Sequence, residues 1–372
     1  DHINSMQHDI SSFSFVLRCS WRSCHNLWVG VRKTVLNALD QISTGASTFL
    51  GEKWATLVEV KAIRKIFGGA SRETYRLQLV VAGETLGIIL RRDPPSSLID
   101  TERQLEFGAY ARIFGSDVPV PEPLFLENEG AYLERPFSIM AAIDDCQTDV
   151  SVLKPEQRKR VGRQKYEILG RLAAKDPVAL GFDEIMPVPR PDECALQQLS
   201  YWESVILADQ LHPQPVAQAA VRWLKGNLPQ AAQKIAVVHG DYRSGNFLYD
   251  TNADITGILD WEMAHLGDPL EDLAWSMDPL WRGEDVDLAG RLLPDEQAIA
   301  IWEESSGLSC DRDALRWWRI FVAVKGIAIW ISSTEDHERG EGKDSILAMA
   351  GWVMTDRQNK ILLNYVAPGA VT

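Results

Sequence analysis

The chain has 372 residues, 45% of them hydrophobic and 24% charged, which is the composition of a folded globular protein with room for more than one domain. Its formal net charge of −14 argues against nucleic acid as the main partner, since duplex binding needs clustered Lys and Arg, and no apolar run approaches the roughly 18 residues of a membrane span. Its five cysteines are scattered without a CxxC pair, which indicates neither a disulfide framework nor a zinc site and makes a reducing cytoplasm the expected compartment.

Residues 1–50 form a segment whose role the sequence leaves open. Residues 1–20 lack the basic stretch followed by a clean apolar run that marks a signal peptide. The stretch VGVRKTVLNALDQI, residues 29–42, predicts a helix, and STGAST, residues 43–48, predicts a loop after it. We therefore treat the segment separately from the lobes that follow.

Residues 51–143 are predicted to form a small lobe built on an antiparallel sheet. The segments 54–69 and 73–92 are rich in β-branched residues or alternate between apolar and polar ones, and the second contains the turn signal AGET. Apolar residues at helical spacing and acidic residues in the first turn predict a helix within 98–114. Extended structure then returns in 118–143, because its prolines exclude a helix.

Residues 144–372 are predicted to form a larger, mainly helical lobe. Its helical patterns are 155–174, 194–211, 215–228, 313–333 and 345–366. The basic run KPEQRKRVGRQK, residues 154–165, is expected to be a solvated helix face rather than a phosphate-binding site. Two short apolar runs, IAVV and ITGILD, interrupt the helices once and flank a polar loop and a further short strand, FLYD.

The polar loop lies in VVHGDYRSGNFLYD, residues 237–250, which we expect to be hairpin-like. Phosphoryl transfer from ATP requires Mg²⁺ ligands, a carboxylate for the attacking hydroxyl, a cation on the phosphates and a glycine-bearing loop over them. The side chains of Asp241, Asn246 and Asp260 supply the oxygens that Mg²⁺ prefers. Asp241 and Asn246 can face a common point if the loop turns at Gly245, and Asp260 comes from the end of the next strand.

The motif HGDYRSGN, followed fourteen residues after its Asn by the Asp of ILDWE, resembles the catalytic-loop and metal-binding motifs of the aminoglycoside phosphotransferase-like kinases. The resemblance extends over about residues 55–365 through FGGASRETYRL, IILRRDPPSSLIDTER, VPVPEPL, HLGDPLEDLAW and ALRWWRIF, and is closest to a bacterial branch related to the kinase domains of acyl-CoA dehydrogenase fusion proteins. It implies an α+β, protein-kinase-like two-lobe fold. A small antiparallel-sheet N-lobe, 51–143, would bind nucleotide, and a mainly helical C-lobe, 144–372, would carry the catalytic loop, the metal site and the acceptor site.

The same resemblance implies roles for single residues of the C-lobe. Asp241 would be the catalytic carboxylate that orients the acceptor hydroxyl and accepts its proton. Asn246 and Asp260 would bind Mg²⁺ that bridges the phosphates of ATP. His239 would shape the loop. Apart from the resemblance, the position of Asp272 at a helix start indicates a structural carboxylate that braces the loop.

In the N-lobe the resemblance implies a turn that covers the phosphates, formed by GGASRE. Its contributing residues would be Gly68, Gly69 and Ser71. Arg91 stands where the best-known kinases carry Lys, and its guanidinium can hold phosphate and stays charged. Its expected carboxylate partner is Glu106, with Glu102 as the second choice.

The resulting hypothesis is an ATP- and Mg²⁺-dependent kinase that phosphorylates a hydroxyl of a small molecule, with a hydroxy acid or hydroxyacyl-CoA as the favoured acceptor. An aminoglycoside-type antibiotic phosphotransferase and a non-catalytic, nucleotide-binding pseudokinase are the alternatives. Neither nucleic acid nor a membrane is expected as a partner, and the sequence leaves the oligomeric state open. Asp268 and His265 are expected to have structural roles.

Overall fold

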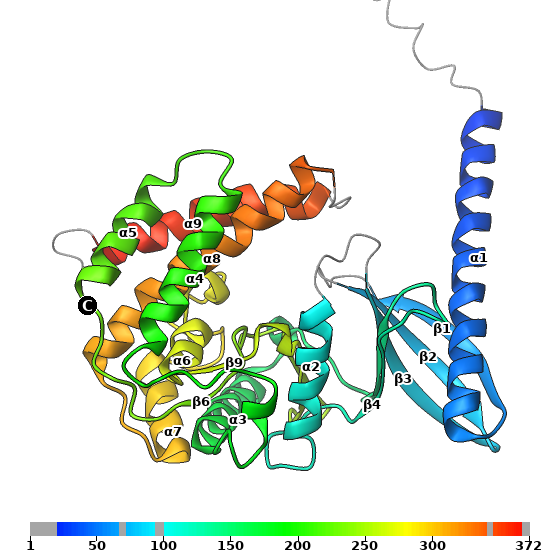
Figure 1. The fold of residues 1–372 in the computed structure, drawn as a ribbon, viewed down its shortest axis with the longest axis horizontal. Helices are drawn as coiled ribbons and strands as arrows, with labels where there is room; N and C mark the ends of the chain where they lie inside the picture. Colours follow the sequence, from blue (N-terminus) through cyan, green and yellow to red (C-terminus); the bar gives the residue numbers. More distant parts are fainter. Residues whose placement is uncertain (1–20, 67–71, 94–99, 341–344, 367–372) are drawn as a thin grey trace, which may run out of the picture.

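The structure is a computed structural model that describes residues 21–66, 72–93, 100–340 and 345–366. It consists of a sheet-based lobe and a larger helical lobe that lie side by side (Figure 1). The predicted α+β, kinase-like two-lobe architecture is therefore confirmed. The predicted boundaries of the lobes stay a prediction.

The N-lobe contains a five-stranded sheet in the order β1-β2-β3-β5-β4, and every neighbouring pair is antiparallel. The strands are β1 (Val58–Ile66), β2 (Glu73–Val81), β3 (Glu84–Arg92), β4 (Pro123–Glu127) and β5 (Phe137–Ala141). Helix α2 (Asp100–Ile113) connects β3 to β4 and lies against the C-lobe (Figure 1). In the register of β2 and β3, Thr74 lies opposite Arg91. The sheet therefore fixes the backbone position of the arginine that is the candidate phosphate-binding residue.

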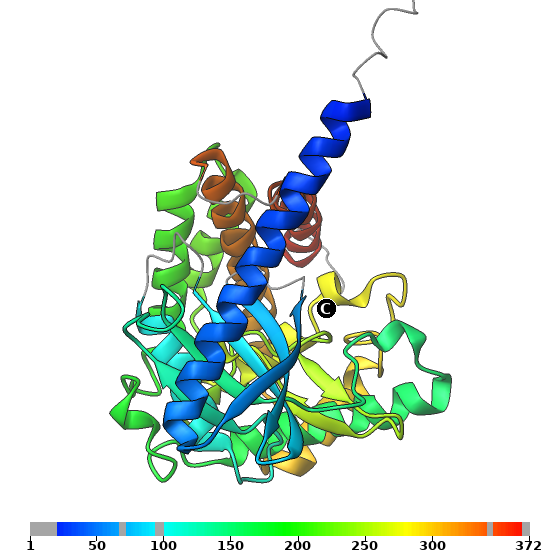
Figure 2. The ribbon, with the colours of Figure 1, turned by 90° about the vertical axis from the view of Figure 1, so that its right-hand side faces the viewer.

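Helix α1 is continuous from Trp21 to Trp54, so the prediction of a loop at 43–48 was wrong. It crosses the outer side of the sheet and continues beyond it (Figures 1 and 2). The small residues of STGAST serve close packing, because a Cβ on Gly45 would lie 2.3 Å from the backbone oxygen of Tyr132. The buried side chain of Phe49 also packs edge-on against Phe137 of the sheet, with ring centroids 5.0 Å apart.

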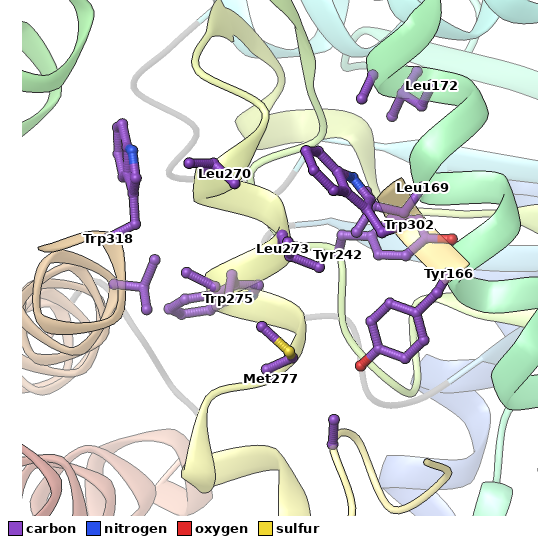
Figure 3. Packing of buried hydrophobic residues seen from close by; sticks show 14 of the residues in the cluster. Tyr166, Leu169, Leu172, Tyr242, Leu270, Leu273, Trp275, Met277, Trp302 and Trp318 are labelled. Carbon is purple, nitrogen blue, oxygen red and sulfur yellow. The ribbon is translucent and has the colours of Figure 1, made fainter. Parts of the chain in front are cut away.

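The C-lobe is mainly helical. Its α-helices are α3 (Pro155–Ala174), α4 (Cys194–Asp209), α5 (Pro215–Gly226), α6 (Leu270–Ser276), α7 (Asp295–Ser306), α8 (Arg312–Glu338) and α9 (Ser345–Val366). Side chains of α3, α6 and α8 meet in its core, where Trp275 of α6 and Trp318 of α8 are buried (Figure 3). The basic run 154–165 is only partly a solvated face, because Lys165 at its end is fully buried. No helix in the described ranges is long and apolar enough to cross a membrane.

Two short sheets in the C-lobe hold the polar loop. One pairs β6 (Ala236–Val238) with β9 (His265–Gly267), and the other pairs β7 (Phe247–Tyr249) with β8 (Ile255–Ile258). The strands that flank the loop therefore belong to different sheets, and the expectation of a hairpin-like loop was wrong. Each end of the loop is therefore held by a different sheet.

Candidate active site

The loop between β6 and β7 depends on two glycines in the left-handed region of backbone space. Gly240 has φ +84°, and a Cβ there would lie 2.3 Å from the backbone oxygen of Met263. Gly245 has φ +108°, a conformation that side chains disfavour. The loop turns at Gly245, where the N–H of Asn246 donates to the backbone oxygen of Arg243 over 3.1 Å, and Asp241 and Asn246 face each other, as the sequence predicted.

Asp241 and Asn246 meet across this loop. Asn246 Nδ2 donates to Asp241 Oδ2 over 2.6 Å and to the Asp241 backbone oxygen over 3.0 Å. Trp275 Nε1 donates to Asp241 Oδ1 over 2.7 Å, and Arg243 Nε donates to Oδ1 over 3.1 Å. Burial raises the pKa of Asp241 above its ordinary value and the negative charge of Asp260 adds to this, while Arg243 and the hydrogen bonds from Trp275 and Asn246 work against it.

His239 connects the loop to the segment that carries Asp260. The backbone N–H of Asp241 can only donate, so Nδ1 of His239 accepts it over 3.1 Å. The ring proton is therefore on Nε2, which donates to the backbone oxygen of Leu259 over 2.8 Å. Burial lowers the pKa of His239 to about 4, so the ring is neutral at neutral pH. This neutral bridge supports the predicted shaping role and gives the ring no free nitrogen for proton transfer.

Asp272, in the first turn of α6, holds the backbone at the start of the loop. Its two carboxylate oxygens accept the backbone N–H groups of His239, over 2.6 Å, and Gly240, over 3.0 Å. Burial raises the pKa of Asp272 to about 7. Asp268, also expected to be structural, accepts the N–H of Leu270 over 2.9 Å in the turn before α6.

Lys325, which sequence reasoning missed, holds the same loop from α8. Its Nζ donates to the backbone oxygen of Gly240 over 2.6 Å and forms an ion pair with Glu271 over 2.8 Å. Glu271 Oε2 also lies 3.0 Å from Nε2 of His265, whose expected structural role this contact supports. Burial would raise the pKa of Glu271, but the charges of Lys325 and His265 outweigh it and lower that pKa to about 2.

Asp260 lies two residues after β8, directly before the 3-10 turn Trp261–Met263, in a left-handed conformation, φ 68°, that Asp tolerates better than most residues. Its backbone N–H donates to the hydroxyl of Tyr110 on α2 over 2.9 Å. Its Oδ1 accepts Arg91 Nη2 over 3.1 Å. Arg91 also forms an ion pair with Glu106 of α2, the partner that the sequence favoured.

Arg91 therefore joins the two lobes at the centre of the candidate site. Burial works against its charge, but the carboxylates of Glu106 and Asp260 raise the pKa of Arg91 above its ordinary value. Its buried Nε has no hydrogen-bond acceptor within the part of the chain that the structure describes. A buried guanidinium with an unused donor fits a ligand that brings anionic oxygens, such as a phosphate.

The oxygens of Asn246 and Asp260 fit Mg²⁺ that arrives with a nucleotide. Within the described ranges, no group of three or more His, Cys, Asp or Glu side chains could hold a metal by itself. Mg²⁺ sites with substrate phosphates use one or two carboxylates and leave the remaining positions to phosphate and water. Asp260, whose side chain is 32% exposed, and the amide of Asn246 match that donor set.

Some predicted site residues cannot be placed. Gly68, Gly69 and Ser71 lie outside the described residues, and so does the side chain of Glu102. Arg72 belongs to the predicted turn and is described, and its guanidinium pairs with Glu106. Sequence reasoning missed Arg72, although the motif GGASRE contains it.

A hollow of about 530 Å³ lies elsewhere, between α1 and the segment 131–134 of the N-lobe. Its lining includes Asp40, Arg92 and Tyr132. None of the C-lobe residues described above lines it, so it is separate from the candidate catalytic loop.

Comparisons with known sequences show the family to which the chain is related. A family model described as the phosphotransferase enzyme family matches residues 62–308. Acyl-CoA dehydrogenase family member 11 from Homo sapiens is 27% identical, in a match that covers 81% of this chain and 39% of that protein. Acyl-CoA dehydrogenase family member 10 from Mus musculus is 25% identical, over 66% of this chain and 22% of that protein. The chain therefore spans less than half the length of these curated relatives.

Solved structures share the fold. A proposed aminoglycoside phosphotransferase from Ralstonia eutropha JMP134 is similar with a TM-score of 0.67 and 18% identity, over 86% of this chain and 97% of that one. An aminoglycoside 2″-phosphotransferase of type IIIa, solved with GDP and kanamycin, has a TM-score of 0.59 and 16% identity, over 85% of this chain and 98% of that one. At such identities the likeness establishes the fold alone.

Proposed function

Because the chain belongs to the phosphotransferase enzyme family, we propose that it is an ATP- and Mg²⁺-dependent kinase for a hydroxyl group of a small molecule. One observation carries the proposal. Asp241 and Asn246 share one loop, and Asp260, one strand later, is bonded to Arg91 of the other lobe. Phosphoryl transfer is catalysed mainly by such positioning and by electrostatic stabilisation.

Each residue has a defined task in the proposed reaction. Asp241 orients the acceptor hydroxyl and takes its proton, while Trp275 and Arg243 hold its carboxylate in place. Mg²⁺, held by Asn246 and Asp260 when it is bound, would neutralise charge on the phosphates. Arg91 would contact the phosphates from the N-lobe side.

We propose a hydroxy acid or hydroxyacyl-CoA as the acceptor. The segment after α6 lies beside the catalytic loop, because Ser244 Oγ donates to the backbone oxygen of Gly290 over 2.7 Å. In and around this segment, two aspartates each hold two arginines: Asp295 holds Arg282 and Arg319, and Asp285 holds Arg158 and Arg291. Arg243 adds a further guanidinium, stacked 4.8 Å above the ring of Trp281. Arginine side chains bind carboxylate and phosphate groups by paired hydrogen bonds, so their presence beside the catalytic loop supports an anionic acceptor.

ATP turnover by the full chain over a panel of acceptors tests the proposal. The panel consists of a short hydroxy acid, its CoA thioester, kanamycin and a control without acceptor, each with ATP and with GTP. Asp241→Asn should lower kcat by about 10²- to 10⁴-fold, because an amide cannot accept the proton. Asp250→Asn, in the same stretch, is the matched control and should stay active. Equal activity of Asp241→Asn and the wild type would show that the assigned mechanism is wrong.

Two alternatives make different predictions. The type IIIa relative was solved with kanamycin, so an antibiotic phosphotransferase remains a candidate. A large, selective rise in the aminoglycoside resistance of a host that expresses this chain would favour it. A pseudokinase would bind Mg–ATP tightly without transfer to any acceptor of the panel.

A further inference from the structure

Glu106 is a buried carboxylate held by two arginines. Its Oε1 accepts Arg91 Nη1, and its Oε2 accepts Arg72 Nη1. The side chains of Glu106 and Arg72 are only 3% and 4% exposed. Glu106 therefore pairs with a second cation, Arg72, in addition to Arg91, and the sequence motifs did not predict this second pair.

Arg72 belongs to a chain of alternating charges in the N-lobe. Arg72 Nε donates to Asp93 Oδ1 over 3.1 Å, and the opposite oxygen of Asp93 accepts Arg103 of α2. Arg103 pairs with Asp93 and lies near the charge of Glu127, while Arg72 pairs with both Asp93 and Glu106. Because Arg72 shares the charge of Glu106, Arg91 does not neutralise it alone, and in this structure Arg91 also faces Asp260.

We propose that Arg72 is a positioning residue of the nucleotide site, an inference that rests on the proposed function. With Mg–ATP bound, Asp260 would serve the metal instead of Arg91, and Arg91 would be available for a phosphate. Arg72 keeps Glu106 fixed and compensated through this exchange, so Arg91 presents a net positive charge. Without Arg72, Arg91 alone would neutralise Glu106, and the attraction of Arg91 for a phosphate would be weaker.

The affinity of the full chain for Mg–ATP, measured by titration calorimetry, tests this inference. Arg72→Met retains the bulk of the side chain without its charge and should weaken binding roughly tenfold or more. Arg72→Lys restores the charge and should recover most of that loss. Arg103→Met is the matched control, because Arg103 is also buried and holds the same Asp93. It should lower the urea midpoint of unfolding as Arg72→Met does, but leave the affinity for Mg–ATP near that of the wild type.

Three results would overturn the inference. The first is that Arg72→Met and Arg103→Met weaken Mg–ATP binding by the same factor, which would reduce Arg72 to a structural role. The second is wild-type affinity in Arg72→Met. If Arg72→Met does not fold, Arg72→Gln, which is polar but uncharged, replaces it in the test. The third contradicting result is then that Arg72→Gln binds Mg–ATP as tightly as Arg72→Lys. A wild-type chain that binds no nucleotide would instead refute the proposed function itself, so the two failures are distinguishable.

Discussion

The imidazole of His239 accepts the backbone N–H of Asp241 at Nδ1 over 3.1 Å, and its other nitrogen donates to the backbone oxygen of Leu259. One neutral ring thus sets the distance between the loop of the proposed catalytic carboxylate and the strand end that carries Asp260. Its position is fixed further by Trp261, whose ring centroid lies 4.5 Å away. The segments that carry Asp241, the proposed proton acceptor, and Asp260, a proposed metal ligand, are therefore connected through His239, which need not ionise for this role.

His239→Phe should preserve the aromatic packing and leave the Asp241 N–H and the Leu259 carbonyl without their partner. We expect kcat to fall roughly tenfold, because each of these buried groups loses a hydrogen bond. The ring is neutral well above its pKa of about 4, so the variant should keep the same pH profile as the wild type between about pH 5 and pH 8. If the wild-type rate changed with pH in this range and that change were lost in His239→Phe, His239 would instead be a proton-transferring group.

The hydrogen bond from Trp275 to Asp241 should influence how the proposed activity depends on pH on the acid side. Burial raises the pKa of Asp241, and the donation from Trp275 Nε1 opposes that rise by stabilising the carboxylate. Trp275→Phe removes the donor, so the pKa of Asp241 should rise further. The acid limb of kcat/KM should therefore move to higher pH than in the wild type. An unchanged or lower limb would show that Asp241 is not the group that titrates. Trp302→Phe is the control, because Trp302 is equally buried and its Nε1 has no hydrogen-bond acceptor within the described residues.

Local motifs were sufficient to predict the fold class and the meeting of Asp241 with Asn246. Their separation is short, and the conformational freedom of Gly245 decides how the loop turns. The pairing of Arg91 with Glu106 could also be predicted, because a strand cation and a helix carboxylate occur in the order of a known fold. In these cases the determining interactions are near in sequence or belong to the recognised pattern.

Contacts between distant segments could not be predicted in the same way. Lys325 reaches the backbone of Gly240 from a helix whose apolar pattern indicates only that it is buried. Lys325 can stay charged in this buried position because it pairs with Glu271. The packing of α6 on α8 brings the two residues together, and local sequence patterns do not show it. The stretch STGAST reads as a loop by composition, yet the close approach of α1 to Tyr132 makes small residues necessary within a helix. Tertiary packing overrides local preference at such positions.

Asp272 should give the stability of the protein a pH dependence that can be measured. Burial raises its pKa from 3.8 to about 7, so between these values the folded state holds a proton that the unfolded state has released. Stability from this group is therefore greatest below about pH 4, decreases as the pH rises to about 7 and is constant above it. Asp272→Asn lacks this titration. The difference in the free energy of unfolding, wild type minus variant, should decrease over that window, as urea titrations at several pH values would show. A difference that grows with pH would contradict the assignment.

The buried ion pair of Lys325 and Glu271 should show strong coupling. Lys325→Met leaves the Glu271 carboxylate buried beside His265 alone and removes the donor to Gly240, so we expect a loss of about 3–5 kcal/mol in the free energy of unfolding. Lys325→Met combined with Glu271→Gln should be less destabilised than the sum of the two single variants, because no uncompensated charge remains. Urea unfolding of the four proteins gives the coupling directly. Lys360→Met, which breaks an exposed pair with Asp356, is the matched control and should change stability little. Additive single losses would mean that the two charges do not depend on each other and that Lys325 acts on the loop only through Gly240.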